Sequence, residues 1–250
     1  MAATHPTAAA GFDRAADAYE RGRPAYPADA VAHLAAHFRL GEGVTVLDLA
    51  AGTGKLTRML ATTGATVIAV EPVEGMRRVL EKGVPGARVL EGTAESIPVE
   101  DGAVDAITVA QAFHWFDAGR AVVEIHRALR PGGGLGLIWN TFDTSVPWVE
   151  ALHTLVGGHR RGEPQYGRSP WRDAFTATRL FEPLEEHTFG LVQELDTGEL
   201  VDRIGSTSYI ATMADADRER LFGEIRALVA DLPRPLRLPY RTDTYVTRKV

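Results

Sequence analysis

Short, continuous apolar runs recur along the first part of the chain, separated by turns and by stretches suited to helices. They lie at residues 44–49, 66–70, 104–110 and 135–139. Runs of this length with few polar residues are typical of parallel strands that are covered on both faces. The pattern therefore predicts an α/β domain with a buried, mostly parallel sheet.

The alternation of strands and helices breaks off near residue 140. The segment from about 140 to 181 is rich in proline, glycine, arginine and large aromatic residues. After this segment the pattern predicts a strand over 185–195, helices over 197–212 and 215–231, and a final strand over 236–247.

The most informative stretch covers residues 46–57, where a buried strand enters a glycine turn. Gly52 and Gly54 permit tight backbone geometry, and a helix is predicted to begin near Lys55. The unpaired amides at a helix start suit a ligand with negative or electron-rich groups. Asp48, inside the apolar strand, requires hydrogen bonds from loop amides or from a ligand. We interpret the turn as a cofactor-binding loop.

Two nucleotide-binding loops do not match this turn. The phosphate-binding loop needs four residues between its glycines and then Gly-Lys-Ser/Thr, whereas here a single residue separates the glycines and Leu56 follows Lys55. The dinucleotide fingerprint needs a third small residue three places after Gly54, where this chain has Thr57. The phosphate-binding interpretation is rejected, and the dinucleotide fingerprint is incomplete.

The pattern Asp48-x-x-x-Gly52-x-Gly54 resembles the first motif of the class I S-adenosylmethionine-dependent methyltransferases. Further segments follow in the order of that family over residues 44–140. The resemblance implies a Rossmann-like α/β fold, with a seven-stranded, mostly parallel sheet that has one antiparallel strand, helices on both faces and a helical cap insert. Together with the residue pattern and composition, the resemblance divides the chain into a mobile tail (1–11), N-terminal cap helices (12–40), a cofactor-binding core (41–140), a cap insert (141–182) and a C-terminal part of the core sheet with two helices (183–250).

The resemblance implies that S-adenosyl-L-methionine is the cofactor. Glu71 follows the second strand, 23 residues after Asp48 (71 − 48), where a carboxylate can reach both hydroxyls of a ribose. Met76 stands where the family often places an apolar side chain against the adenine ring, and a thioether packs well on an aromatic face. The resemblance also implies cofactor contacts from Ala50, Gly52 and Gly54 after the first strand, from Pro72 after the second strand and from Gln111 after the fourth.

The segment 89–98 resembles the one that lines the adenine edge in this family. The family often has Asp where this chain has Thr93. The departure leaves Glu95, or backbone groups of Thr93 and Ala94, as the predicted contact with the exocyclic amine.

Aromatic residues and arginines interleave in the segment 12–40, which is predicted to form a helix, an Arg-Pro-x-Tyr-Pro turn and a second helix from about Asp29. It resembles an N-terminal element of some small-molecule methyltransferases. Two interpretations stay open. Either the segment packs on one face of the sheet, or Tyr19, Arg23 and Tyr26 close over the cofactor, with Arg23 or a tyrosine hydroxyl at the methionine carboxylate.

The fourth strand runs into an aromatic segment at the place where the family's acceptor approaches the methyl group. An acceptor that must lose a proton is helped by a base of near-neutral pKa, and His114 is our candidate. A histidine among aromatic residues is also often a packed wall residue, and a carboxylate acceptor needs no base. The predicted acceptor-binding residues are Phe113, His114, Trp115, Trp139, Trp148 and Arg172.

Five arginines cluster in the middle of the chain, at positions 160, 161, 168, 172 and 179. They form either a solvated helix face or a pocket for a carboxylate-bearing small molecule, which guanidinium groups bind well.

Composition excludes several classes of function. The net charge of −6 and the presence of only three lysines argue against a nucleic-acid partner. The lack of cysteine excludes disulfides, thiolate metal ligands and a cysteine nucleophile, and we predict no metal. No apolar stretch approaches membrane-spanning length, and we predict a cytoplasmic protein with no membrane partner. No assembly state is predicted.

The segment around His114 resembles methyltransferases of small organic acids such as trans-aconitate. With the arginine cluster, this predicts methyl transfer to an oxygen of a small molecule, a carboxylate or a hydroxyl, while methylation of an amine in secondary metabolism stays open. The Asn/Asp-Pro-Pro-aromatic motif of enzymes that methylate nucleobase or glutamine nitrogens is absent. The alternatives are a non-catalytic protein that binds the cofactor, as a sensor or a partner subunit, and an NAD-dependent reductase.

Overall fold

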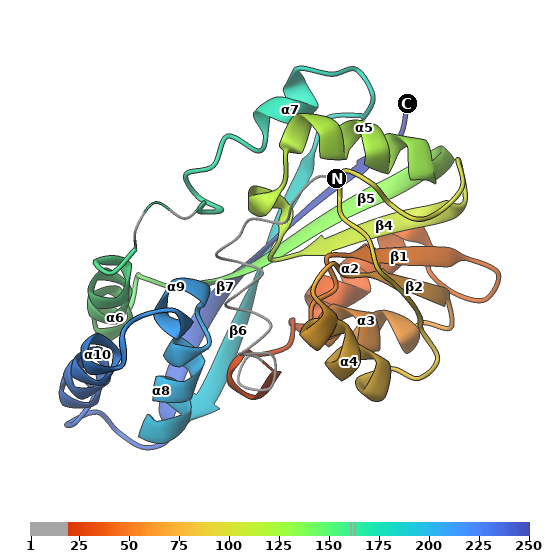
Figure 1. Ribbon diagram of the computed structural model, residues 1–250. Helices are drawn as coiled ribbons and strands as arrows, with labels where there is room; N and C mark the ends of the chain where they lie inside the picture. The colour runs from red at the N-terminus through yellow and green to blue at the C-terminus, as the bar shows by residue number, and fades with distance from the viewer. Residues whose placement is uncertain (1–19, 161, 163) are drawn as a thin grey trace.

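The computed structural model describes residues 20–160, 162 and 164–250, and a single seven-stranded sheet runs through them in the order β3-β2-β1-β4-β5-β7-β6 (Figure 1). The strands β1 to β5 pair in parallel, whereas β7 is antiparallel to both of its neighbours. The predicted mostly parallel sheet with one reversed strand is therefore confirmed. The strands are β1 (Thr45–Leu49), β2 (Thr66–Val70), β3 (Arg88–Leu90), β4 (Val104–Ala110), β5 (Leu129–Phe142), β6 (Glu185–Leu195) and β7 (Leu236–Arg248).

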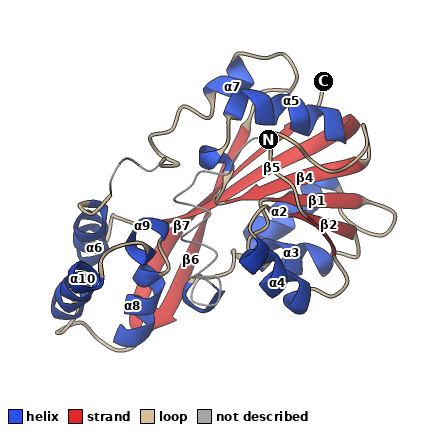
Figure 2. Cartoon of the chain, in the orientation of Figure 1, coloured by secondary structure: helices blue, strands red, loops and turns tan. Residues whose placement is uncertain are grey.

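Helices cover both faces of the parallel part of the sheet, as Figure 2 shows. α2 (Ala28–Phe38) and α3 (Lys55–Ala61) pack on one face, and α5 (Ala118–Ala128) and α7 (Asp173–Thr176) pack on the other. α4 (Glu74–Gly83) follows β2, and the short 3-10 helix η1 (Phe113–Trp115) follows β4. No helix in the described ranges has the length and apolarity to cross a bilayer.

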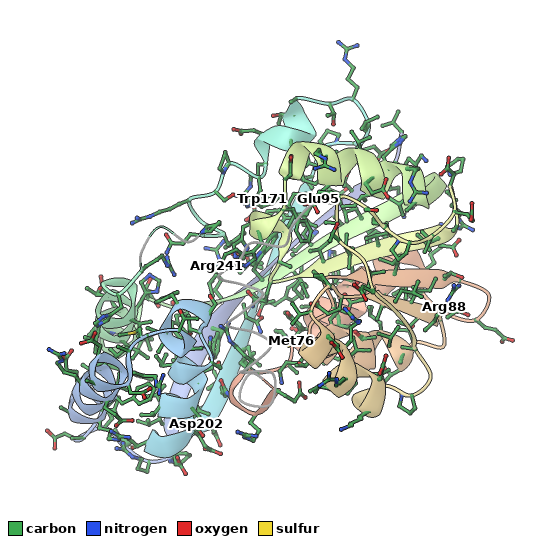
Figure 3. All side chains as sticks on the ribbon, viewed as in Figure 1. Met76, Arg88, Glu95, Trp171, Asp202 and Arg241 are labelled. Atoms are coloured by element: carbon green, nitrogen blue, oxygen red, sulfur yellow. The ribbon has the colours of Figure 1, made fainter. Side chains whose placement is uncertain are left out.

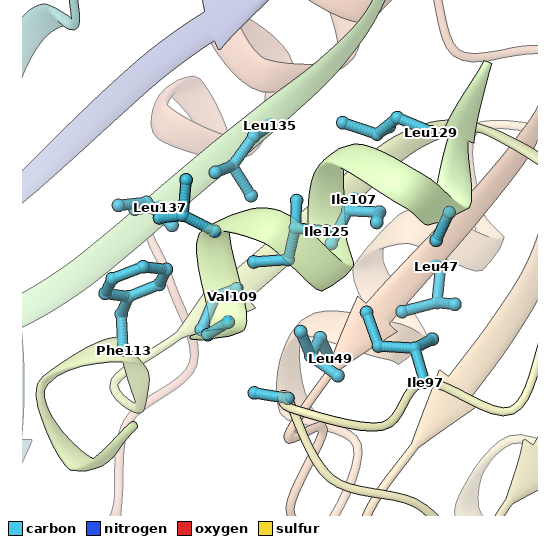
Figure 4. Packing of buried hydrophobic residues seen from close by; sticks show 14 of the residues in the cluster. Leu47, Leu49, Ile97, Ile107, Val109, Phe113, Ile125, Leu129, Leu135 and Leu137 are labelled. Atoms are coloured by element: carbon cyan, nitrogen blue, oxygen red, sulfur yellow. The ribbon is translucent and has the colours of Figure 1, made fainter. Parts of the chain in front are cut away.

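The core explains the continuous apolar runs. Leu47 and Leu49 of β1 pack with strand residues of β4 and β5 and with Ile125 of α5 (Figure 4), and all three are fully buried. Val46, immediately before Leu47, points to the opposite face and packs with α2 and α3. Because both faces are covered, neither set of alternating positions can be polar without a partner.

A second apolar cluster lies beyond the parallel part of the sheet. The far ends of β5, β6 and β7 carry α6 (Pro147–Gly157), α8 (Thr197–Gly205), α9 (Ser208–Ala211) and α10 (Asp215–Leu228), which gather around them in Figure 1. The predicted insert 141–182 is thus divided between the two clusters, since α6 joins the C-terminal helices and α7 packs near α5.

The structure differs from the sequence predictions at three element boundaries. β5 begins at Leu129 rather than near residue 135, because its first residue already pairs with β4. The helix predicted over 197–212 is broken after Gly205, where the hydroxyl of Ser206 donates to the carbonyl of Arg203 and Thr207 adopts an extended conformation. α10 ends at Leu228, three residues before the predicted end at 231.

Candidate functional site

Asp48 lies beneath the glycine turn and not on its surface. Its side chain is fully buried in β1 and accepts hydrogen bonds from the hydroxyls of Thr57 at 2.6 Å and Thr108 at 3.0 Å. Burial raises the pKa of Asp48 to about 6, while the two hydroxyls act in the opposite direction. Two threonine hydroxyls and the backbone amide of Thr57 thus satisfy Asp48 from within the fold, and its contact with a ligand stays a prediction. Asp48 therefore anchors the start of α3 below the turn.

The turn itself has the conformation that its glycines predict. Gly52 and Gly54 have φ angles of +58° and +85°, a region that side chains disfavour. Ala50, at the end of β1, and Gln111, at the end of β4, also have positive φ angles, of 55° and 60°. Strained non-glycine residues of this kind cluster at functional sites. Two neighbouring strand ends thus carry strained backbone at the same edge of the sheet.

Glu71 joins the end of β2 to the glycine turn. Its carboxylate accepts hydrogen bonds from the amides of Gly52 and Val73, both at 2.9 Å, and its side chain is only 5% exposed. Burial raises the pKa of Glu71 to about 7, against the opposing effect of the two amides. A carboxylate acceptor is therefore held at the edge of the sheet next to the turn.

The residues predicted to contact the adenine ring lie in different environments. Met76 is buried beside Val73, and Pro72 accepts a hydrogen bond from Arg77 through its carbonyl. The hydroxyl of Thr93 is buried and has no hydrogen-bond partner within the described part of the chain. A buried hydroxyl without a partner is costly, and it indicates a missing polar group at that position.

Ala94 and Glu95 lie next to Thr93 but face other parts of the molecule. Ala94 is buried in the cluster below α5. The carboxylate of Glu95 accepts a hydrogen bond from the amide of Asp117 at 3.0 Å, and Figure 3 shows Glu95 beside the start of α5, whereas Met76 lies on α4. The Glu95 side chain thus orders the loop before α5, and the unpaired hydroxyl of Thr93 is the stronger candidate for a ligand contact.

The N-terminal segment reaches the glycine turn from the described residue Glu20 onward. The carboxylate of Glu20 accepts from the hydroxyl of Thr53 at 2.5 Å and pairs with Lys55 and Arg58. Tyr19 lies outside the described residues. Tyr26 is buried against α2, which agrees with the packing interpretation of this segment.

A smaller cavity opens where the N-terminal segment meets the ends of β1 and β4. Arg23 and Tyr26 line it together with the residues of the turn from Ala50 to Thr53 and with Gln111. The segment therefore combines both interpretations, since it packs on the sheet and also covers the turn.

A larger cavity of about 510 Å³ lies between the strand ends and the helices of the second cluster. Arg23, Gln111, Asn140 and Arg203 line both this cavity and the smaller one. The side chain of Gln111 donates to the carbonyl of Asn140 at 3.1 Å, so these two residues are joined where the cavities meet. A ligand at the glycine turn and a second molecule in the larger cavity would meet at this junction.

His114 and Trp139 form part of the wall of the larger cavity and contact each other. The indole Nε1 of Trp139 donates to Nδ1 of His114 at 3.2 Å. Burial, together with the charges of Arg160 and Arg23, lowers the pKa of His114 to about 4. His114 is therefore neutral at neutral pH, and its proton is on Nε2.

Arginines dominate the charge of the larger cavity. Arg23, Arg160, Arg168 and Arg203 line it, and the described lining residues include neither Asp nor Glu. Arg203 is a site residue that the sequence prediction missed, although the residue pattern of α8 could have indicated it. It lies three residues after Leu200 and next to Ile204 on the buried face of α8, where an arginine interrupts an apolar stripe.

Several predicted acceptor residues do not line this cavity. Phe113 is fully buried in the core under α5, and Trp148 packs on the second apolar cluster. Arg172 stacks on Trp171 and Tyr245 and pairs with Glu186, outside the cavity. Of the predicted acceptor residues, the structure brings together His114, Trp115 and Trp139 at this cavity.

The arginines that cluster in the sequence reach the cavity only in part. Arg160 and Arg168 line it, while Arg161 lies outside the described residues.

Comparison with known proteins finds methyltransferases among both the sequence relatives and the solved structures. Residues 47–137 match the family described as a methyltransferase domain. An uncharacterized methyltransferase of Mycobacterium tuberculosis (strain ATCC 25618 / H37Rv) is 42% identical over 238 residues, which cover 92% of each chain. The solved structure of a candidate type II methyltransferase from Anaeromyxobacter dehalogenans is 26% identical, with a TM-score of 0.65 over 90% of this chain and 96% of that one. A geranyl diphosphate methyltransferase solved in complex with S-adenosylmethionine shares the fold, with a TM-score of 0.52 and 16% identity over 89% of this chain and 85% of that one.

Proposed function

Because the chain belongs to the class I S-adenosylmethionine-dependent methyltransferases, we propose that it transfers the cofactor's methyl group to an oxygen atom of a small organic acid. The observation that carries this proposal is the larger cavity, which has four arginines and no carboxylate among its described lining residues. Such a cavity is complementary to an anion.

The described residues fit the cofactor at the strand ends. Glu71 offers a buried carboxylate to a ribose diol, and Gly52 leaves open space beside the turn, since no heavy atom lies within 4 Å of an added Cβ. The unpaired hydroxyl of Thr93 offers a polar contact to the adenine edge. Arg23 and Tyr26 would cover the other side of the turn.

When bound, S-adenosylmethionine supplies a methyl group that is already strongly electrophilic. The protein therefore has to align the acceptor oxygen with that group and exclude water. Gln111 and Asn140 stand at the junction of the two cavities, where this alignment would take place. Attack by a carboxylate oxygen forms the new C–O bond as the C–S bond breaks, and no proton has to be removed.

The geometry of His114 agrees with a carboxylate acceptor better than with a proton-losing one. The lone pair on Nδ1 is occupied by the indole N–H of Trp139, so the nitrogen left for the cavity is Nε2, which carries a proton. A donor of this kind binds an oxyanion but cannot accept a proton. We therefore assign His114 to acceptor binding, and its role as a general base is replaced by that of a hydrogen-bond donor.

The test is methyl transfer from labelled cofactor to a panel of carboxylic acids, phenols and amines. We expect products that release methanol on mild alkaline hydrolysis, as methyl esters do. Transfer to amines or phenols alone would contradict the acid acceptor. Thermal stabilisation by S-adenosylhomocysteine but not by NAD(P)H is the parallel check on the cofactor. Stabilisation without transfer to any acceptor would favour a non-catalytic sensor or partner subunit.

A further inference from the structure

Arg203 is a buried cation without a countercharge. Its side chain is 6% exposed on α8, and no carboxylate of the described residues lies within ion-pair distance of it. Arginine is rarely buried to this extent unless it is paired. An unpaired buried charge is strongly unfavourable, so the site is set up for an anion that the protein itself does not provide.

The guanidinium group of Arg203 is held in one orientation by its neighbours. It lies over the rings of Phe142 and Tyr240, at 5.1 Å and 5.7 Å from their centroids, and its Nε donates to the Tyr240 hydroxyl at 3.0 Å. That hydroxyl in turn donates to Gln193 at 2.9 Å. Both aromatic faces attract the cation and restrict its rotamers. The terminal nitrogens of the fork therefore remain available in a preorganised position.

The surroundings of Arg203 belong mainly to the larger cavity. Thr207, which precedes α9, and Ser208 and Tyr209, the first residues of α9, line that cavity together with Arg203. They are contributed by the C-terminal helices, whereas His114 is contributed by the opposite part of the fold, after β4. The acceptor would then be held by polar groups on two different walls.

We propose that Arg203, with the hydroxyl-bearing turn after α8, is a binding site for a second oxyanion of the acceptor, one that is not methylated. This proposal rests on the proposed function and narrows it to small acids that carry two anionic groups. One group is placed beside His114 and the cofactor, and the other is paired by the guanidinium fork of Arg203. A bidentate pair of this kind fixes both orientation and specificity.

The first test compares three variants: Arg203→Met, Arg203→Lys and, as the matched control, Arg172→Met. Arg172 is also stacked on aromatic rings, but outside the cavity. We expect Arg203→Met to melt at the same temperature as the wild type or higher, because it removes an unpaired buried charge. A structural role for Arg203 predicts instead a lower melting temperature with unchanged ligand selectivity.

The second test measures selectivity with succinate, glutarate and adipate, each against its monoamide, by binding in the presence of S-adenosylhomocysteine. We expect the wild type to bind at least one diacid about tenfold or more tightly than the monoamide, which is the ratio that one charge-assisted pair provides. Arg203→Met should abolish this ratio, Arg203→Lys should restore part of it, and Arg172→Met should preserve it. Equal ratios in the wild type and in Arg203→Met, or no preference in the wild type, would overturn the proposal.

A third measurement distinguishes whether the anion that binds Arg203 belongs to the acceptor or to the cofactor. Affinities for S-adenosylhomocysteine and for 5′-methylthioadenosine, which lacks the amino-acid part, are compared in the wild type and in Arg203→Met. Unchanged affinities support the acceptor site. A loss confined to S-adenosylhomocysteine shows that Arg203 binds the cofactor carboxylate and overturns the proposal. If diacids bind through Arg203 but no acid is methylated, the proposed function fails and the anion site stands.

Discussion

The indole N–H of Trp139 donates to Nδ1 of His114, which lines the larger cavity, and this 3.2 Å hydrogen bond determines which imidazole nitrogen carries the proton. Trp139 is almost completely buried at the end of β5, so the bond comes from a rigid element. A tryptophan N–H can only donate, and therefore the imidazole can only accept at Nδ1. The pairing selects one tautomer and leaves an N–H donor for a ligand.

The first prediction follows for substitutions of His114. Glutamine can place an amide N–H near the position of Nε2, so His114→Gln should keep methyl transfer within about tenfold of the wild type, which corresponds to one hydrogen bond. His114→Ala should lose more, mainly as a higher KM for the acceptor. The measurement is kcat and KM for each variant. A general base contributes about a hundredfold or more to kcat, so equally large kcat losses in both variants would restore the base role.

The sequence predicts the frame of this site well because local patterns carry it. Asp48 lies within a strand, and the glycine turn and Glu71 follow strands, whose apolar runs are unambiguous. Parallel strand ends meet at one edge of a sheet. The positive φ angle of Gln111 has no comparable signal in the sequence, because a glutamine rarely adopts this conformation.

The acceptor side of the site depends on contacts between distant segments, which no local pattern records. Arg203 reaches the cavity because α8 packs on the far end of β7, and Phe113 leaves it because the core below α5 takes the aromatic ring. The arginines that cluster in the sequence are also separated in the fold. Arg168 lines the cavity, whereas Arg172 packs against Tyr245. Polar side chains of the two halves of the chain are combined only in the folded protein.

The second prediction concerns Glu71 and pH. Its folded pKa of about 7 lies above the ordinary value, so the folded state without ligand binds this proton more tightly than the unfolded state. The stabilisation that this proton contributes to the folded state is present in full below the ordinary pKa of Glu71. It is lost as the pH rises through about 7. The melting temperature of the wild type should therefore fall more steeply from about pH 5 to about pH 8 than that of Glu71→Gln, which cannot ionise.

Cofactor binding should have the opposite dependence on the charge of Glu71. Ribose hydroxyls donate to a carboxylate, so the affinity for S-adenosylhomocysteine should increase as the pH rises through about 7, by at most about tenfold per pH unit. Glu71→Gln should bind more weakly and lose this pH dependence. Titration calorimetry of both proteins measures it, and identical pH profiles would contradict a contact between Glu71 and the cofactor.

The third prediction concerns the buried hydrogen bond between Thr57 and Asp48. Thr57→Val preserves the shape of the side chain but removes a donor at 2.6 Å from a fully buried carboxylate. We expect the free energy of unfolding to fall by about 1–3 kcal/mol, the usual range for a buried group left with a missing partner.

The loss caused by Thr57→Val should depend on pH. Because the pKa of Asp48 is raised to about 6, the carboxylate is charged mainly above that pH, and the loss should be larger at about pH 8 than at about pH 5. Thr57→Ser keeps the hydroxyl and serves as the control in urea unfolding. Equal stabilities of the valine and serine variants at high pH would show that the bond contributes nothing.

The fourth prediction concerns Tyr166, which ties the segment before α7 to the wall of the larger cavity. Its ring stacks on Trp139 with 4.4 Å between centroids, and its hydroxyl donates to the buried carboxylate of Asp243 at 3.0 Å. Tyr166→Ala removes both contacts and should raise the KM for the acceptor about tenfold or more, because the cavity wall loses its position. Tyr166→Phe keeps the stacking and should raise KM less. The affinity for S-adenosylhomocysteine should stay unchanged in both.

Thr188→Val is the matched control for Tyr166, since the Thr188 hydroxyl donates to the same carboxylate of Asp243 at 2.9 Å but Thr188 does not line the cavity. It should lower the free energy of unfolding by about 1 kcal/mol, as Tyr166→Phe does, because each variant removes one donor from a carboxylate that keeps others. Only the Tyr166 variants should change the KM for the acceptor. If Thr188→Val raises KM as much as Tyr166→Ala does, the effect comes from Asp243 and β7, and Tyr166 has no specific role in holding the cavity wall.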